Sequence, residues 1–129
     1  MKWVIAPLIE GDHIRVKRDF YYHHGIYIGN DEAIHFTGSE GDSISSPEKV
    51  SIMRTSMDFF SKGEIVEKAE LDKKEKKYLY KRDRIVKTAI NSVGEKGYDI
   101  LHNNCEDFAN RICYKKSLSS QLDDFKKKI

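Results

Sequence analysis

The 129-residue sequence has few cysteines and few prolines, with two of each. If Cys105 and Cys113 lie on one helix, their Cα atoms are about 12 Å apart, at a rise of about 1.5 Å per residue. A disulfide needs a much shorter separation, so this arrangement excludes an internal bridge. Two thiols that do not pair with each other favour a reducing compartment, and we expect a cytoplasmic protein.

Long apolar runs and an excess of either charge are also lacking. No window approaches the roughly 20 apolar residues of a membrane span, and residues 1–10 are too short and too poorly flanked for a signal peptide. Lys and Arg number 23 against 21 Asp and Glu, a formal charge of +2 that gives no electrostatic case for nucleic acid. We expect one soluble domain over residues 1–129, without a transmembrane segment or a nucleic-acid partner.

The first third of the chain has the pattern of antiparallel strands. Apolar and charged residues alternate over 14–17, aromatic and β-branched residues fill 22–28, and 33–37 is a further apolar run. The turn-forming residues 29–31 connect the last two segments. The pattern therefore predicts a β-hairpin.

The rest of the chain mixes short strands with helices. We expect an exposed loop over 38–48, strands over 49–53 and 64–67, one helical turn over 56–60, a helix over 72–93 with a solvated lysine-rich face, and a helix from Asn103 or Asn104 to Cys113. Together these segments predict an α+β fold, a small antiparallel sheet packed against helices.

Cys105 is placed at the first turn of the last predicted helix, on its apolar face. Unpaired N–H groups and the positive end of the helix dipole favour thiolate over thiol at such a position. Glu106 and Asp107 suit the same turn, and both should point away from the sulfur. On local sequence alone, a nucleophile and an inert buried cysteine are equally good interpretations.

A cysteine nucleophile needs an imidazole within hydrogen-bond reach, and the predicted hairpin offers His23, His24 and His35. Alternation along a strand puts His23 on one face with Gly25 and Tyr27. A connection of three or five residues would place His23 and His35 on the same side of the sheet, whereas two or four would separate them. A three-residue connection, such as 29–31, would set Gly25 opposite His35.

Each histidine also has a plain structural interpretation, which for a single strand histidine is the more common one. His102 and Cys105 have the spacing His-x-x-Cys, but zinc sites usually show a tighter set of paired ligands. We therefore expect no metal and no cofactor. His13 and His102 are interpreted as surface or structural residues.

Several segments together resemble the lecithin:retinol acyltransferase-like family. The similar segments, in family order, are Gly11-Asp12-His13-Ile14, Tyr22-His23-His24-Gly25-Ile26-Tyr27-Ile28-Gly29, Ala33-Ile34-His35-Phe36, the stretch 55–63, Ser92-Val93-Gly94-Glu95, and Asn104-Cys105-Glu106-Asp107-Phe108-Ala109. The resemblance covers about residues 10–122. It implies a circularly permuted relative of the NlpC-type, papain-like cysteine peptidases, in which the histidines precede the cysteine.

The resemblance also implies roles for individual residues. Cys105 matches the nucleophile, His23 the general base, and His35 the second histidine that orients the base. Tyr22 matches a position that helps to shape the oxyanion site, and Asn104, beside the nucleophile, is a further candidate for that role.

The sequence departs from the family pattern at a few places. Asp107 stands where many members have histidine, and His24 stands where animal members usually have an aromatic residue. Many members carry a C-terminal hydrophobic anchor that is not seen here, which weakens the case for membrane-lipid substrates. The tail over 118–129 could form a short amphipathic helix with weak membrane contact, although packing on the domain or fraying is favoured.

Three classes of function remain open. The first is acyl transfer or hydrolysis on an ester through a thioester acyl-enzyme, as in the acyltransferases and phospholipases of this family. The second is amide hydrolysis of a peptide or isopeptide, of the NlpC type. The third is a non-catalytic interaction module. The expected partner is an acyl ester or amide substrate, and the sequence indicates no oligomeric state.

Overall fold

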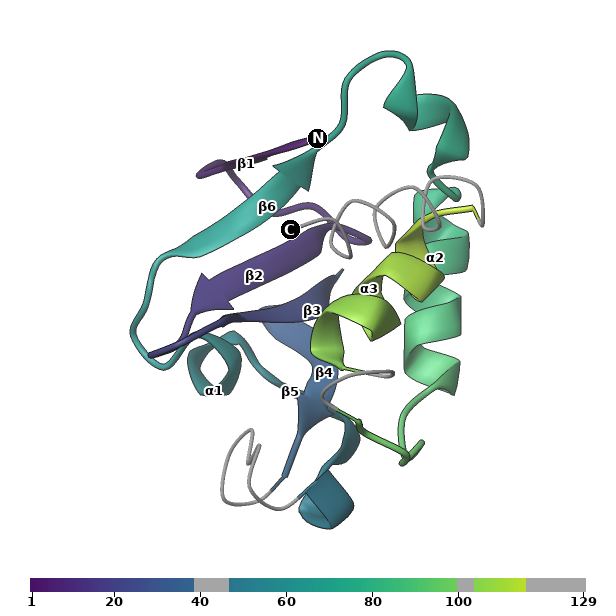
Figure 1. Cartoon of the computed structure of the whole chain (residues 1–129). Coiled ribbons are helices and arrows are strands. Elements are labelled where there is room, and N and C mark those ends of the chain that lie inside the picture. Colours follow the sequence, from purple (N-terminus) through teal and green to yellow (C-terminus); the bar gives the residue numbers. More distant parts are fainter. Residues whose placement is uncertain (39–46, 100–103, 116–129) are drawn as a thin grey trace.

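A six-stranded antiparallel sheet organises the chain in the computed structural model, which describes residues 1–38, 47–99 and 104–115. The strand order is β1-β6-β2-β3-β4-β5 (Figure 1). The strands are β1 (Lys2–Val4), β2 (His13–Lys17), β3 (Tyr22–Gly29), β4 (Glu32–Thr37), β5 (Ser51–Ser56) and β6 (Val66–Glu70). The helices are α1 (Met57–Ser61), α2 (Arg82–Asn91) and α3 (Cys105–Cys113), with 3₁₀ turns η1 (Pro47–Lys49) and η2 (Glu75–Tyr78). The predicted α+β class with a small antiparallel sheet is confirmed.

The sheet buries both of its faces, against α2 and α3 on one side and α1 on the other (Figure 1). Ile26 and Ile34 belong to the core under α3, together with Phe108 of that helix. Val16 packs with Phe60 of α1 in the second core. Because side chains alternate along a strand, consecutive residues of β3 point into different cores.

The hairpin between β3 and β4 turns at Asn30 and Asp31, whose φ angles of 50° and 60° give the two left-handed residues of a type I′ turn. Ile26 pairs with Ile34, and a bulge shifts the register before Gly29. The extra residue of the bulge makes the two-residue turn equivalent to the predicted three-residue connection. The facing of the two strands is therefore the one that a three-residue connection would give.

The prediction of one helix over 72–93 is wrong in part, because the segment is divided into η2 and α2. Between them the chain is extended, and Leu79 forms an isolated antiparallel bridge with Tyr114. The amide of Tyr80 also donates to the carbonyl of Cys113. These bonds to the end of α3 take the backbone groups that a continuous helix would have used internally.

Other expected elements differ mainly at their ends. The strand expected over 49–53 is β5, the one expected over 64–67 is β6, and both lie a few residues later in the chain. The helical turn at 56–60 is confirmed as α1, whose N-cap Ser56 accepts a hydrogen bond from the amide of Phe59. β1 was not predicted.

Parts of two further predictions lie outside the described residues. These are most of the loop expected over 38–48 and the whole tail over 118–129. None of the helices within the described residues is long and apolar enough to cross a membrane.

Candidate active site

Cys105 is the first residue of α3, where a capping box fixes the start of the helix. The side-chain oxygen of Asn104 accepts from the amide of Asp107 at 2.9 Å, and the Asp107 carboxylate accepts from the amide of Asn104 at 3.1 Å. This reciprocal pair satisfies two amides that would otherwise lack a partner at a helix end. The thiol is thereby held at the end of the helix where the dipole favours a negative charge.

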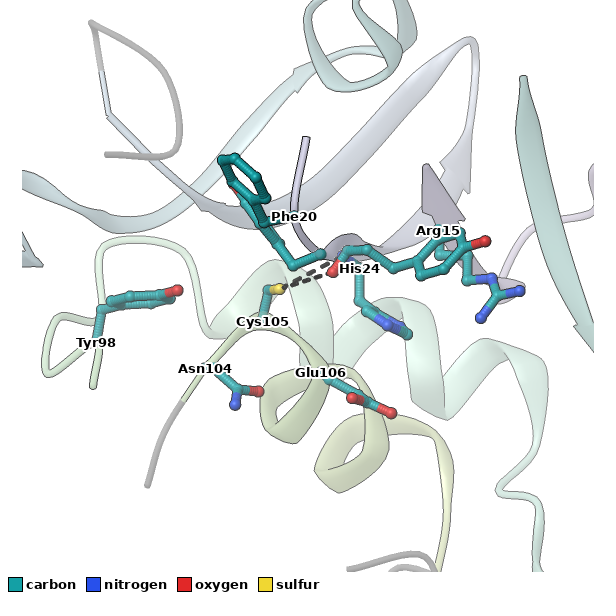
Figure 2. Close-up of a pocket in the computed structure, with 9 residues that line it drawn as sticks. Arg15, Phe20, His24, Tyr98, Asn104, Cys105 and Glu106 are labelled. Atoms are coloured by element: carbon teal, nitrogen blue, oxygen red, sulfur yellow. Dashed lines mark hydrogen bonds between the residues drawn. The ribbon is translucent and has the colours of Figure 1, made fainter. Parts of the chain in front are cut away.

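The Cys105 sulfur lies against the backbone of β3, beyond the end of its ladder with β4. The part of β3 that pairs with β4 covers residues 26–29. The amide of His24 donates to Sγ at 3.5 Å, and Sγ donates to the carbonyl oxygen of Tyr22 at 3.8 Å (Figure 2). The thiol of Cys105 therefore contacts the backbone of the two residues that flank His23.

His23 and His35 meet on the α1 face of the sheet. Nε2 of His23 lies 2.8 Å from Nδ1 of His35, and both side chains are buried. Gly25 follows His23 by two residues on the same face of β3, and a Cβ there would come within 3.2 Å of the His35 Cβ and 2.8 Å of the Phe60 ring. The absence of a side chain at Gly25 is therefore what lets His35 and Phe60 approach His23.

The hydrogen bonds beyond His35 are compatible with one arrangement of protons on the two imidazoles. With the Thr55 hydroxyl donating to the carbonyl of Ser56, its oxygen accepts from Nε2 of His35 at 2.8 Å. Nδ1 of His35 then accepts from Nε2 of His23. In that tautomer the lone pair of neutral His23 is on Nδ1. Thr55 was noted in the sequence only as part of a similar segment.

The environment of His23 favours its neutral form. Burial lowers the pKa of this imidazole well below 6.5, and coulombic repulsion, from His35 whenever that ring is protonated and from the Arg18 guanidinium, lowers it further. The side chain is packed against the ring of Phe60, with the ring centroids 5.3 Å apart. At neutral pH the residue is therefore a base that has not yet taken up a proton.

His24 points to the face opposite His23 and belongs to a second buried chain of polar groups. Its Nδ1 lies 2.8 Å from Nε2 of His13, and Nδ1 of His13 lies 2.8 Å from the hydroxyl of Tyr114. His13 is 4% exposed, so of the two interpretations offered by the sequence, surface or structural, the surface one is wrong. No local sequence pattern indicates this series of hydrogen bonds, since its members come from β2, β3 and the end of α3.

A pocket of about 370 Å³ opens beside the Cys105 sulfur (Figure 2). Four of its lining residues are Phe or Tyr. The lining also includes one basic and one acidic side chain, a histidine and the Cys105 thiol. The lining residues are Arg15, Phe20, Tyr21, Tyr22, His24, Tyr98, Asn104, Cys105 and Glu106. A reacting group in this pocket would have access to the thiol from the side of the sheet that carries His24.

The two residues expected to shape the oxyanion site both line this pocket. The ring of Tyr22 stacks under the guanidinium of Arg15 at 3.8 Å, and its carbonyl oxygen is the atom that contacts the thiol. Asn104 uses its side-chain oxygen to cap α3. Glu106 lines the pocket as well, with its carboxylate extending away from the sulfur in Figure 2.

The second cysteine differs from Cys105 in its surroundings. Cys113 is fully buried at the end of α3, and burial raises the pKa of its thiol far above the ordinary value. His102, the other half of the His-x-x-Cys spacing, lies outside the described residues. Over residues 1–38, 47–99 and 104–115, no three His, Cys, Asp or Glu side chains are grouped so as to hold a metal ion.

Comparison with known proteins gives a consistent result over most of the chain. The family described as lecithin retinol acyltransferase matches residues 7–118. Lecithin retinol acyltransferase of Bos taurus is 26% identical over an aligned stretch of 140 residues, gaps included. The alignment covers 94% of this chain and 61% of the bovine protein. The Rattus norvegicus protein is 24% identical with the same coverage. The chain thus spans less than two thirds of the length of these relatives.

Proposed function

The chain belongs to the lecithin retinol acyltransferase family, and on that premise we propose that it transfers or hydrolyses acyl groups through a thioester on Cys105. The observation that carries the proposal is the directed chain from His23 through His35 to Thr55. In this arrangement the basic lone pair is on Nδ1 of His23. The residues before and after His23 contact the sulfur of Cys105 through their backbone.

In the first half-reaction, Nδ1 of His23 accepts the thiol proton and the Cys105 thiolate attacks the acyl carbonyl carbon. The charge that develops on the imidazolium is shared with His35, which holds the ring in one tautomer and orientation. Because burial disfavours the charged form, His23 gives the proton up again readily when the leaving group needs it. The alcohol or amine departs with that proton, and the thioester remains.

The oxyanion of the tetrahedral intermediate needs hydrogen-bond donors close to the sulfur. We assign this role to backbone N–H groups in the first turn of α3, which point along the helix axis and add the field of the helix dipole. Asn104 contributes by fixing that turn through the capping box. Tyr22 contributes by forming part of the pocket wall beside the thiol.

The pocket lining favours an acyl ester over a peptide as the substrate. Four aromatic rings line the space next to Cys105, and Phe20 is 99% exposed at its edge. Aromatic surfaces of this kind gain free energy by covering an acyl chain. A peptide amide would instead require a cleft with backbone-directed polar groups along its length.

Intact mass spectrometry tests the proposal directly. The protein is incubated with a panel of acyl esters and, in parallel, acyl amides and peptides. We expect an acyl adduct from esters that is absent in Cys105→Ala. Cys113→Ala is the matched control, because its thiol is buried with a raised pKa and should not react.

Two outcomes would contradict the proposal. One is an adduct that survives Cys105→Ala, which would move the nucleophile elsewhere. The other is the lack of any adduct from esters, amides or a thiol-directed electrophile, which would favour an interaction module. Adducts from amides alone would correct the substrate class and leave the nucleophile in place.

A further inference from the structure

His24, His13 and Tyr114 form a hydrogen-bonded series on the opposite side of the sheet from His23. His24 lines the pocket beside Cys105, and its own backbone amide donates to Sγ. It is 4% exposed, and its ring is held by a 2.8 Å hydrogen bond to His13. The backbone that contacts the sulfur therefore carries a buried histidine on each face of the sheet.

The partners of His24 hold its ring in a defined orientation. Nδ1 of His24 is bound to Nε2 of His13, and the other nitrogen of His13 is bound to the Tyr114 hydroxyl. The edge of the Trp3 ring packs on both imidazoles, at centroid distances of 4.9 Å from His13 and 5.5 Å from His24. With Nδ1 engaged, Nε2 is the nitrogen of His24 through which proton exchange in the pocket would occur.

One direction of these bonds makes Nε2 of His24 the basic nitrogen. With the Tyr114 hydroxyl donating to the sulfur of Met1, its oxygen accepts from Nδ1 of His13. Nε2 of His13 then accepts from Nδ1 of His24. In that tautomer the lone pair of neutral His24 is on Nε2. The same logic, applied on the other face, places the lone pair of His23 on Nδ1.

We infer that His24 is the general base of the second half-reaction, in which an acceptor attacks the thioester on Cys105. This inference rests on the proposed function. A water, alcohol or amine in the pocket passes its proton to Nε2 of His24 as its oxygen or nitrogen bonds to the acyl carbon. The carbon–sulfur bond then breaks, and the thiolate leaves with the electron pair. The proton returns from His24 to the sulfur, which restores the thiol.

The division of work follows from where the two imidazoles lie. His23 is 1% exposed and packs against Phe60 on the α1 face, whereas His24 lines the pocket that an acceptor would enter. In this scheme His13 is a positioning residue: it fixes the ring of His24 and takes up part of its positive charge. Tyr114 completes the chain.

Kinetics with a p-nitrophenyl acyl ester separate the two half-reactions, because the first acylation releases p-nitrophenolate as a burst and later turnover reports deacylation. For His24→Phe, which keeps a flat ring without nitrogens, we expect a burst rate within threefold of wild type. Steady-state turnover should fall by about 10² to 10⁴, the usual contribution of general acid–base catalysis. Intact mass should show the acyl-enzyme accumulating on Cys105.

Two further variants make the pattern diagnostic. His35→Phe should slow the burst itself, because His35 orients the base of the first half-reaction. His13→Gln should also lower steady-state turnover, by a smaller factor than His24→Phe, and should leave the burst rate unchanged. A purely structural role for His13 or His24 would instead lower the burst and the turnover together. His24→Gln provides the same comparison if His24→Phe fails to fold.

The inference is overturned if His24→Phe and His24→Gln turn over within threefold of wild type, or if burst and turnover fall in parallel. Failure of the proposed function looks different. In that case the wild-type protein itself gives no Cys105-dependent burst or adduct, and the role of His24 falls with it. A normal wild-type burst with unchanged His24 variants rejects only the present inference.

Discussion

At the scale of single residues, the proposed function gives Thr55 a role in orienting the protons of His23 and His35. Its hydroxyl contacts the Ser56 carbonyl and Nε2 of His35. If it donates to the former and accepts from the latter, the lone pair of neutral His23 is on Nδ1.

Replacing Thr55 should separate this effect from packing. Thr55→Val keeps the shape and removes the hydrogen bond, and should lower the acylation rate about three- to tenfold, the equivalent of about 0.5–1.5 kcal/mol. Thr55→Ser retains the hydroxyl and should remain close to wild type. The measurement is the burst rate with a chromogenic ester. Equal rates for the two variants would show that the proton direction at His35 is set by another group.

The buried imidazole of His23 should also make stability depend on pH. Its pKa is lowered in the folded protein, by burial first and by His35 second. At a pH between this lowered pKa and 6.5, the unfolded chain binds more protons than the folded protein. The contribution of His23 to stability is therefore complete above pH 6.5 and is lost as the pH falls below it. The contribution of this one group is at most about 1.4 kcal/mol per pH unit.

Urea unfolding at pH 7.5, 6.5 and 5.5 measures that dependence. His23→Asn removes the titrating group and should give a shallower loss of unfolding free energy between pH 6.5 and 5.5 than wild type. His13, His24 and His35 are present in both proteins, so the difference reports His23 together with its coupling to His35. Parallel curves would mean that His23 titrates in the folded state as it does in the unfolded chain.

The sequence left the facing of His23 and His35 open, because it depended on the length of one connection. The turn itself has two residues, and the bulge before Gly29 brings the two histidines to one face, where they lie 2.8 Å apart. Thr55 and His13 were missed because their partners come from other strands, and no local pattern fixes the register between β4 and β5 or between β2 and β3. The catalytic roles given to Cys105 and its histidines remain predictions.

At the scale of elements, α3 was predictable because its signals are contained within it. Asn104, the acidic first turn and the apolar face all lie within the segment, and the capping box confirms the start. The segment 72–93 has equally good helical periodicity but is interrupted by bonds to Tyr114 and Cys113 at the end of α3. Hydrophobic periodicity does not show when the backbone groups of a segment form hydrogen bonds with distant residues.

The cap of α3 makes a testable distinction for Asn104. Asn104→Ala should cost about 1 kcal/mol of unfolding free energy, because the amide of Asp107 loses its acceptor. Asn104→Ser restores an N-cap acceptor and should recover both the stability and the acylation rate. The measurements are urea unfolding and the burst rate on the same samples.

A different result would change the role of this residue. If Asn104→Ser is as stable as wild type but acylates about 10² to 10³ times more slowly, the size expected for a lost oxyanion donor, then the side-chain amide acts on the intermediate itself. Capping alone would then be an incomplete account of Asn104.

At the scale of the whole molecule, the sheet joins strands that are distant in sequence. β6 pairs with β2, and β1 pairs with β6 at the edge, so two early segments are separated by a strand from the middle of the chain. The meander from β2 to β5 follows chain order and could be anticipated in part from its hairpin. The position of β1 and β6 depends on long-range pairing, which composition and periodicity do not encode.

Asp12 connects these distant parts beside the second histidine chain. Its carboxylate is 3% exposed and lies 2.8 Å from Nζ of Lys68 on β6 and 2.9 Å from Nη1 of Arg82 on α2. It also accepts from the amide of Ile9 at 2.7 Å. One buried carboxylate therefore holds the N-terminal segment, the sheet and a helix together, next to His13.

The two ion pairs of Asp12 should differ greatly in their effect on stability. Lys68 is 13% exposed, so Asp12→Asn leaves a mostly buried ammonium without its counter-charge and should cost about 3 kcal/mol. Arg82 is 46% exposed, so Arg82→Gln should cost about 1 kcal/mol or less, because water screens that pair and hydrates the lost charge. Urea unfolding at pH 7.5 ranks the two variants. Equal losses of unfolding free energy would mean that the ion pair with Arg82 of α2, and not the one with Lys68 of the sheet, accounts for the stabilisation by Asp12.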